Sequence, residues 1–431
     1  MQTLLIEAEG FQHQSIALKI RIFIPFKRVI NNNFHALTHK NYRYFWLGQC
    51  VSLIGTWMQT MGQTWLVFTL TNSPLLLGLL GAMQFLPITI FSLFVGVIID
   101  KYPKKKILIM TQSISMVLAL ILATLVFTNN LKYGYILILA VLLGITNSID
   151  MPTRQAFTIE IAGKEDLMNA IALNSAVFNL AKILGPAIGG IIMAILGAGW
   201  CFLLNGISFI AVIYSLSQIT IIPYVRKKKY NNIIKEIMDG LRYIYQEKVL
   251  FQTILLILIV GIFAFNYSVL VPILTKNVLN RNEAGYGTLM AFLGVGSLFG
   301  AITVSIKSRS VPKVKVMIIS SLVTAVLLFL VGFSRNFYLT AIILCGTGIS
   351  NIYFSTTANT TLQMNSKNEY RGRVMSVYSL AFAGATPIGS LFAGAASSGF
   401  GVSKAFSLSG ILIVFFIAVI SLIFVKKSKL N

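Results

Sequence analysis

The sequence predicts an all-α membrane protein with twelve transmembrane helices in two pseudo-symmetric six-helix halves. The chain of 431 residues is 56% hydrophobic and only 11% charged, whereas a soluble domain carries about 25% charged residues. Apolar runs of about 20 residues, each long enough to cross a bilayer, recur along the whole chain. Basic residues also gather on one side of the membrane that these runs define.

We expect the first span at about 44–70. Its polar side chains recur at spacings of three and four, so they form a stripe along one helical face. Such a stripe predicts either hydrogen bonds to neighbouring helices or the lining of a water-filled cavity, and Gln59 and Gln63 are its cavity candidates. The remaining spans are expected at 75–99, 107–128, 134–157, 169–196, 200–220, 249–275, 285–306, 314–333, 338–362, 373–396 and 403–425.

The charge distribution gives the expected orientation. A net charge of +23 would also suit a nucleic-acid-binding protein. In the predicted topology, however, five of the 35 Lys and Arg residues lie on one side, Lys182 lies inside the membrane, and all the others lie on the opposite side. This asymmetry follows the positive-inside rule and places both termini in the cytoplasm. It argues against nucleic acid as a partner and favours contacts with anionic lipids.

The longest charged connection divides the membrane region in two. We expect a cytoplasmic extension (1–40), an N-terminal half (41–222), a cytoplasmic linker (223–248), a C-terminal half (249–425) and a cytoplasmic tail (426–431). Residues 1–33 suit a poorly ordered extension, and the alternative is a basic segment at the membrane interface.

The two halves look like diverged copies. A shift of 209 residues places Gly78 on Gly287, Ala82 on Ala291 and Lys104 on Lys313. A parallel repeat of this kind predicts a substrate site near the bilayer midplane, between the halves, which rock around it.

A short basic turn at 96–106 separates two apolar runs. Gly96 lies four residues before Asp100, so both occupy one helical face. Gly96 allows a neighbouring helix to approach, and Asp100 can cap the start of the span that begins near 373, where the helix dipole favours an acid. These features predict a cytoplasmic gate composed of Gly96, Asp100, Lys101, Lys104, Lys105, Arg371 and Arg373.

The fourth span ends with a pair of opposite charges. Asp150 and Arg154 are four residues apart and can pair on one helical face. Charges at this depth are costly and point to a function. Two interpretations compete: a permanent clamp or gate near the cytoplasmic end, joined by Asp100 or Glu160, and a proton switch in which protonation of Asp150 releases Arg154.

The fifth span combines close-packing residues with a charge. Small residues at spacing four permit close helix packing, and the proline adds a kink; the packing set is Gly185, Pro186, Gly189 and Gly190. Lys182 lies about 20 Å deep in the same span. A lone cation there predicts either contact with an anionic substrate group or an ion pair, with Asp150 as the nearest carboxylate by depth. Asn351 and Asn359 in the tenth span complete the predicted cavity.

Several of these motifs resemble the major facilitator superfamily. The pattern Gly-x-x-x-Asp-Lys-x-x-Lys-Lys at 96–105 resembles its loop 2–3 signature, with Pro103 replacing a usual glycine. The pattern at 181–190 resembles the Gly-x-x-x-Gly-Pro-x-x-Gly-Gly signature of antiporters, with Ala181 replacing the first glycine. Across about 34–425, the chain resembles the bacterial drug:proton antiporter branch that contains the enterobactin exporter and macrolide efflux proteins.

The resemblance implies a plasma-membrane exporter of small molecules, driven by protons. One alternative is an exporter of siderophores or other anionic metabolites. An alternative of another class is a membrane interaction or lipid-binding protein that does not transport. The sequence offers no metal-ligand cluster, phosphate-binding loop or nucleophile arrangement, so we expect neither an enzyme nor a cofactor. We expect a monomer.

Overall fold

The computed structural model describes residues 34–91, 95, 99, 101–163, 165–220, 233–307, 314–367 and 369–429, and every regular element in them is a helix. Eleven helical segments among these residues are long and apolar enough to cross a membrane. They are α3 (Pro74–Phe91), α5 (Lys104–Phe127), α6 (Tyr133–Ala162), α7 (Leu167–Leu196), α8 (Ala198–Gln218), α10 with α11 (Lys248–Phe263, Tyr267–Asn277), α12 (Glu283–Lys307), α13 (Val314–Phe333), α14 (Phe337–Met364), α15 (Arg371–Phe400) and α16 (Val402–Lys429).

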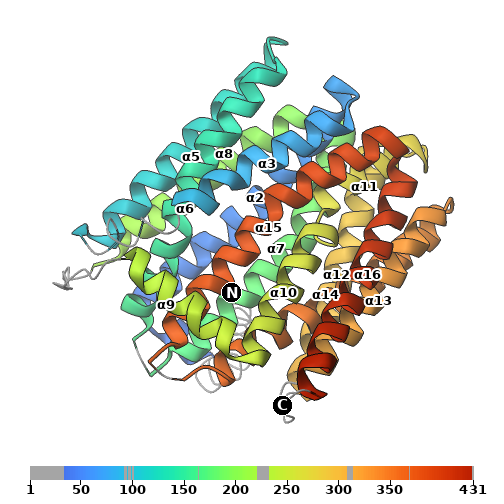
Figure 1. Cartoon of the computed structure of the whole chain (residues 1–431). Coiled ribbons are helices and arrows are strands. Elements are labelled where there is room, and N and C mark those ends of the chain that lie inside the picture. Colours follow the sequence, from blue (N-terminus) through green and yellow to red (C-terminus); the bar gives the residue numbers. More distant parts are fainter. Residues whose placement is uncertain are drawn as a thin grey trace, which may run out of the picture.

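The first predicted span is α2 (Lys40–Thr71), a helix of 32 residues. Its polar stripe makes it the least apolar of the long helices, so it falls outside the eleven. At 1.5 Å per residue it is nevertheless about 48 Å long, more than the hydrocarbon core requires. It runs through the bundle against α7 and α8 (Figure 1). With α2 included, the prediction of twelve helices is confirmed.

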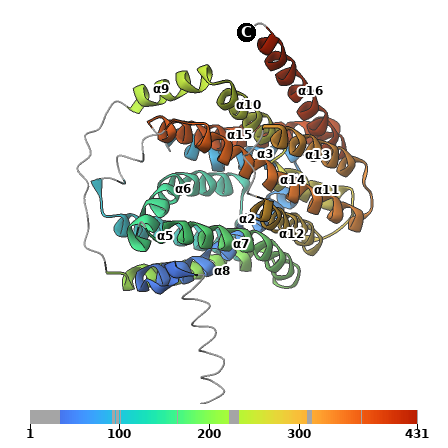
Figure 2. The same ribbon diagram turned by 90° about the horizontal axis from the view of Figure 1, so that it is seen from below.

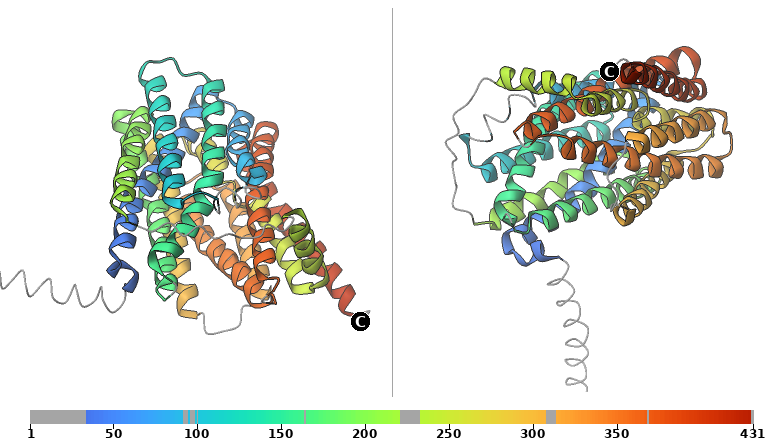
Figure 3. Two further views of the ribbon diagram at one scale, coloured as in Figure 1. Left: turned by 90° about the vertical axis from the view of Figure 1, so that its left-hand side faces the viewer. Right: turned by 60° about the horizontal axis from the view of Figure 1, so that its bottom comes forward.

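The helices form two groups of six. Helices α5 to α8 of the first half and α11 to α14 of the second half occupy opposite sides of the bundle, while α3 and α15 lie together (Figure 2). The start of α2 and the end of α16 lie at the same end of the bundle as α9 (Ile233–Gln246), as the left view of Figure 3 shows. We refer to this as the α9 end, and to the opposite end as the far end.

Two helix pairs, α3 with α15 and α7 with α12, form the most extensive contacts between the halves. A Cβ placed on Gly78 of α3 would lie 2.5 Å from the Ser390 carbonyl oxygen and 2.9 Å from the Gly394 Cα on α15. On Gly287 of α12, a Cβ would lie 2.5 Å from the Pro186 carbonyl oxygen of α7. The two glycines that the repeat superimposes therefore occupy equivalent places, and their hydrogen side chains allow the halves to touch through main-chain atoms.

The predicted linker, expected only as a charged connection, contains the helix α9. Gly240, Tyr243 and Ile244 recur on one face of α9 and are buried, so the helix is amphipathic. The Tyr243 ring stacks on Tyr370 with 4.3 Å between centroids, and its hydroxyl accepts a hydrogen bond from the Lys367 main-chain N–H. Helix α9 is therefore held against the second half.

The last residues before α2 also pack on the bundle. A short 3₁₀ helix, η1 (His35–Thr38), precedes α2. The Ala36 main-chain N–H donates to the Asn169 side chain, and His39 Nε2 lies 2.7 Å from the Asp166 carboxylate. Residues 34–40 of the predicted extension are thus attached to the start of α7, while residues 1–33 lie outside the described chain.

Candidate transport pathway

The lysines of the basic turn connect helices of the first half. Lys104 forms an ion pair with Glu160 of α6 at 2.8 Å. Lys105 donates to the Ile219 carbonyl oxygen just after α8, at 2.7 Å. Lys101 is exposed. These side chains tie the starts and ends of α5, α6 and α8 together at the α9 end.

Of the other predicted gate residues, the structure describes the two arginines but not the glycine and the aspartate. Gly96 and Asp100 lie outside the described residues. Arg371 donates to a main-chain carbonyl of α14 at 3.2 Å, and Arg373 lies 3.7 Å from Asp239 of α9. Within the described residues, no polar contact of these basic groups joins the first half to the second.

Asp150 accepts four hydrogen bonds in a buried network. It is 4% exposed. Its Oδ2 accepts from Arg154 Nη2 at 2.5 Å and Nε at 3.1 Å. Its Oδ1 accepts from Thr111 Oγ1 at 2.7 Å and Gln112 Nε2 at 2.8 Å, both on α5. The pair therefore joins α6 to α5, whereas Glu160 pairs elsewhere, with a lysine.

The α5 partners were not identified from sequence. Thr111 and Gln112 begin a short polar stretch (TQSIS, 111–115) within a long apolar run, which was the available signal. All four hydrogen bonds are donated to Asp150, so a proton on this carboxyl would displace one donor. Both carboxylate oxygens of Asp150 are thus paired, whereas the Gln112 Oε1 atom is buried without a partner. A buried polar network of this kind favours one arrangement of its helices, and this geometry suits the clamp interpretation.

The polar stripe of α2 makes contacts inside the first half. Gln59 Oε1 accepts from Asn205 Nδ2 of α8 at 2.6 Å. Gln59 and Gln63 are both buried. For Gln59, the structure therefore supports the interpretation as an interhelical hydrogen bond.

Replacing Gln59 by alanine tests whether this residue packs or binds. We expect a loss of about 1–3 kcal/mol in unfolding free energy, because the Asn205 amide is left without its partner in an apolar setting. The substrate profile should stay unchanged. Thermal unfolding in detergent and substrate concentration dependence of transport measure the two effects. An unchanged melting temperature with an altered KM would place Gln59 in the cavity instead.

The predicted polar residues of α14 differ in their surroundings. Asn351 is buried, donates to Tyr267 Oη at 2.8 Å and accepts from Thr324 Oγ1 at 3.3 Å. It thus joins α11, α13 and α14. Asn359 is partly exposed and accepts from Gln363 of the same helix. Of the two, only Asn359 is partly exposed.

The glycine motif of α7 packs in two directions. A Cβ on Gly185 would lie 2.5 Å from Trp57 Cβ of α2. Gly189 faces Met58 of the same helix. Gly190 lies against Gly287 of α12, across the boundary between the halves. One motif therefore attaches α7 both to its own half and to the other half.

At the far end, an aromatic cluster bridges the halves. Trp65 of α2 donates its indole N–H to Glu283 Oε1 of α12 at 3.0 Å. The Trp65 ring stacks on Tyr286 at 5.8 Å, and the Tyr286 hydroxyl lies 3.0 Å from Thr64 Oγ1. Glu283 and Tyr286 were not singled out from sequence, because they lie at the boundary of a predicted span.

The face of α7 that meets the other half changes from buried to exposed along its length. Pro186 and Gly190, toward the far end, are buried. Ile171, Ser175 and Phe178 continue the same face toward the α9 end at helical spacing, and all three are exposed. The contact with α12 therefore holds at the far end and is lost toward the α9 end.

Helix α15 shows the same change in the other contact between halves. Ser390 and Gly394 are buried against α3, whereas Gly372, Ser376 and Ser379 on the continuing face are exposed. Both contacts between halves are thus closed at the far end. The described faces that would extend them toward the α9 end are open.

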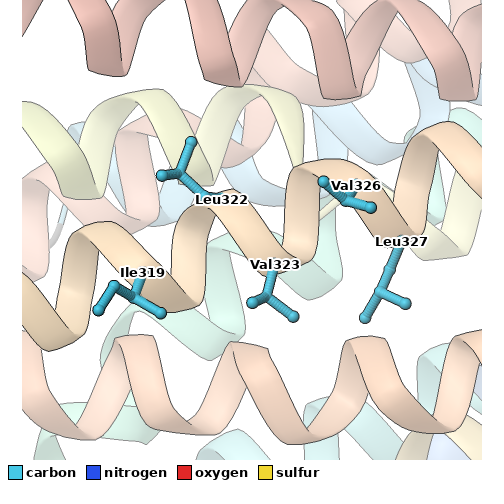
Figure 4. Close-up of a pocket in the computed structure, with 5 residues that line it drawn as sticks. All are labelled: Ile319, Leu322, Val323, Val326 and Leu327. Carbon is cyan, nitrogen blue, oxygen red and sulfur yellow. The ribbon is translucent and has the colours of Figure 1, made fainter.

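A separate apolar hollow of about 290 Å³ runs along α13 (Figure 4). Its lining consists of aliphatic side chains from this one helix: Ile319, Leu322, Val323, Val326 and Leu327. A second hollow of about 340 Å³ lies between α13 and α16. Neither adjoins the charged groups described above, and their apolar walls suit lipid acyl chains.

Comparisons with known proteins agree with this architecture. A family described as "transmembrane secretion effector" matches residues 31–430. The Staphyloferrin A transporter of Staphylococcus aureus is 29% identical over 374 residues, covering 86% of this chain and 92% of that protein. Macrolide efflux protein A of Streptococcus pyogenes is 23% identical over 382 residues, with the same two coverages.

A solved structure gives the same result for the fold. A bacterial homologue of the human lysosomal transporter Spinster, in an inward-facing and unoccupied conformation, superimposes with a TM-score of 0.69. It covers 88% of this chain and 95% of its own, at 13% identity. The chain belongs to the transmembrane secretion effector family of the major facilitator superfamily.

Proposed function

We propose that this protein exports small molecules from the cell by alternating access and that protons moving inward drive the export. The observation that carries the proposal is the pair of contacts between halves, closed at the far end and open toward the α9 end. A cavity between two halves that opens to one side is the arrangement that alternating access requires.

The orientation follows from the basic residues. Lys104, Lys105, Arg371 and Arg373 all lie at the α9 end, and short basic loops stay in the cytoplasm. We therefore propose a plasma-membrane location, cytoplasmic termini and an inward-open state for this structure. The secretion family and two of the relatives, the Staphyloferrin A transporter and macrolide efflux protein A, support outward transport of small molecules.

The gates alternate in this proposal. The far end is closed by glycine contacts and by the pair Trp65–Glu283. When the far end opens, the α9 end closes. Asp100 then meets the start of α15, and Arg373 leaves Asp239 to pair with Asp100. The lysines of the basic turn and Gly96 complete this cytoplasmic gate.

Few carboxylates are placed so that they could carry the coupled proton. Asp150 lies inside a span, and Glu283 lies at the start of α12. In the clamp interpretation Asp150 stays ionised and holds α5 to α6; in the switch interpretation its protonation releases Arg154 and loosens the cytoplasmic end. The protein works as a monomer surrounded by lipid and uses no cofactor. A non-transporting interaction protein is the competing class.

Dye efflux from an efflux-deficient bacterium tests the function. Cells that express the protein should lose rhodamine 123 or carboxyfluorescein faster than cells with an empty vector. A protonophore should abolish the difference, because it removes the driving force. Export that persists with the protonophore would argue against proton coupling, and equal loss from both strains would favour the non-transporting class.

A further inference from the structure

The clearest unexplained charge in the membrane region is Lys182. It lies midway along the 30 residues of α7, at the depth where an unpaired charge is most costly. Among the described residues, none forms an ion pair or hydrogen bond with its ammonium group. Asp150, the partner expected by depth, is committed to Arg154 and two α5 side chains.

The position of Lys182 on α7 is equally specific. The face of α7 that carries Lys182 is buried at Pro186, toward the far end, and is exposed from Phe178 toward the α9 end. Lys182 lies between them and is partly exposed. Its carbonyl oxygen lies beside Gly294 of α12, toward the inner limit of the glycine contacts between these helices. The ammonium group is therefore placed where the two halves begin to separate, which is the apex of the opening.

The neighbours of Lys182 are aromatic. Its Nζ lies 6.0 Å from the centre of the Trp57 ring on α2, and Trp57 meets Phe178 edge-to-face at 5.6 Å. A cation–π contact contributes about 0.5–2 kcal/mol. This is less than the several kcal/mol that removal of an ion from water costs. The site therefore lacks a counter-charge that a ligand can supply.

We propose that Lys182, together with Trp57 and Phe178, forms a subsite for an anionic group of the substrate, and that the exported molecules carry a carboxylate or similar anion next to an apolar or aromatic part. This inference rests on the proposed function and specifies its substrate class. The anion neutralises the ammonium group, and the two rings contact the adjoining apolar part. If α7 and α12 then came together toward the α9 end, they would enclose the substrate anion and the ammonium group of Lys182.

Two dyes with the same xanthene core test the charge preference. Carboxyfluorescein, loaded as its diacetate and hydrolysed inside the cell, is anionic, and rhodamine 123 is cationic. Lys182→Gln removes the charge and keeps most of the length, whereas Lys182→Arg keeps the charge. Lys132→Gln removes an exposed lysine at the start of α6 and serves as the matched control. All variants are compared at equal membrane expression.

We expect wild type to export carboxyfluorescein and Lys182→Gln to export it about tenfold more slowly, the effect of losing one charged hydrogen bond. Rhodamine 123 export should not fall in this variant, and Lys182→Arg and Lys132→Gln should resemble wild type. Normal carboxyfluorescein export by Lys182→Gln would overturn the subsite. Wild-type export of rhodamine 123 without carboxyfluorescein would also overturn it while leaving export intact. Export of neither dye would overturn the proposed function and, with it, this inference.

Discussion

Replacing Asp150 by alanine should abolish export and destabilise the folded protein by about 3–5 kcal/mol, the usual cost of removing one partner from a buried ion pair. The substitution leaves Arg154 without its carboxylate and the Gln112 amide N–H without its acceptor. The Thr111 hydroxyl keeps the Leu108 carbonyl oxygen at 3.1 Å as an acceptor. Thermal unfolding in detergent and dye efflux at equal expression measure the two effects. A variant that exports and unfolds like wild type would contradict the buried network.

A carboxylate on the same helix provides the control. Glu160 pairs with Lys104 near the end of α6, where both side chains are partly exposed. Because exposed ion pairs contribute only about 0–1 kcal/mol, Glu160→Gln should change stability little. An equal loss from both substitutions would mean that any charge change on α6 is harmful.

A double substitution separates the clamp from the switch. Asp150→Asn with Arg154→Gln removes both charges, so it should recover part of the stability that Asp150→Asn alone loses. In the clamp interpretation, uncoupler-sensitive export returns with the stability. In the switch interpretation, stability returns, but the proton gradient no longer drives export.

Replacing Gly394 by valine should also abolish export, because the larger side chain prevents closure of the far end. A Cβ at this position would lie 2.8 Å from the Pro74 carbonyl oxygen and 2.9 Å from the Gly78 Cα. These are main-chain atoms of the opposite half, so they cannot move aside without separating α3 from α15. Overpacking of this kind costs about 1–3 kcal/mol or more, and the cost falls only on states in which the far end is closed.

Gly399→Val on the same helix is the matched control, since a Cβ there meets nothing within 4 Å. We expect it to export normally. Efflux at equal membrane expression measures both variants. Normal export by Gly394→Val would show that the tight α3–α15 contact is not required in the transport cycle.

The helices and the close-packing motifs could be predicted from sequence, because length, apolar content and spacing are local properties. The α7 motif was found in this way. Its counterpart on α15, Ser390 and Gly394, was not singled out, although it meets Gly78 just as Pro186 and Gly190 meet Gly287. A second register in the repeat, with a shift of 204 residues, would have revealed it.

Partners across helices could not be predicted, because they depend on the rotation of each helix about its axis. The stripe containing Gln59 suited a cavity and a packing contact equally well, and only the α8 partner Asn205 distinguishes them. The same applies to Lys182, for which the sequence left both a ligand and Asp150 as candidates. The structure commits Asp150 to other donors, and Trp65 and Glu283 meet although 218 positions separate them.

Proton movement in a reconstituted system tests the central claim most directly. Purified protein is placed in liposomes that contain a pH-sensitive dye, and a fluorescent substrate identified by the cell assay is added with no imposed gradient. The account predicts that substrate flux moves protons in the opposite direction and that an imposed pH gradient accelerates substrate flux. Substrate flux that neither moves protons nor responds to the gradient would contradict it.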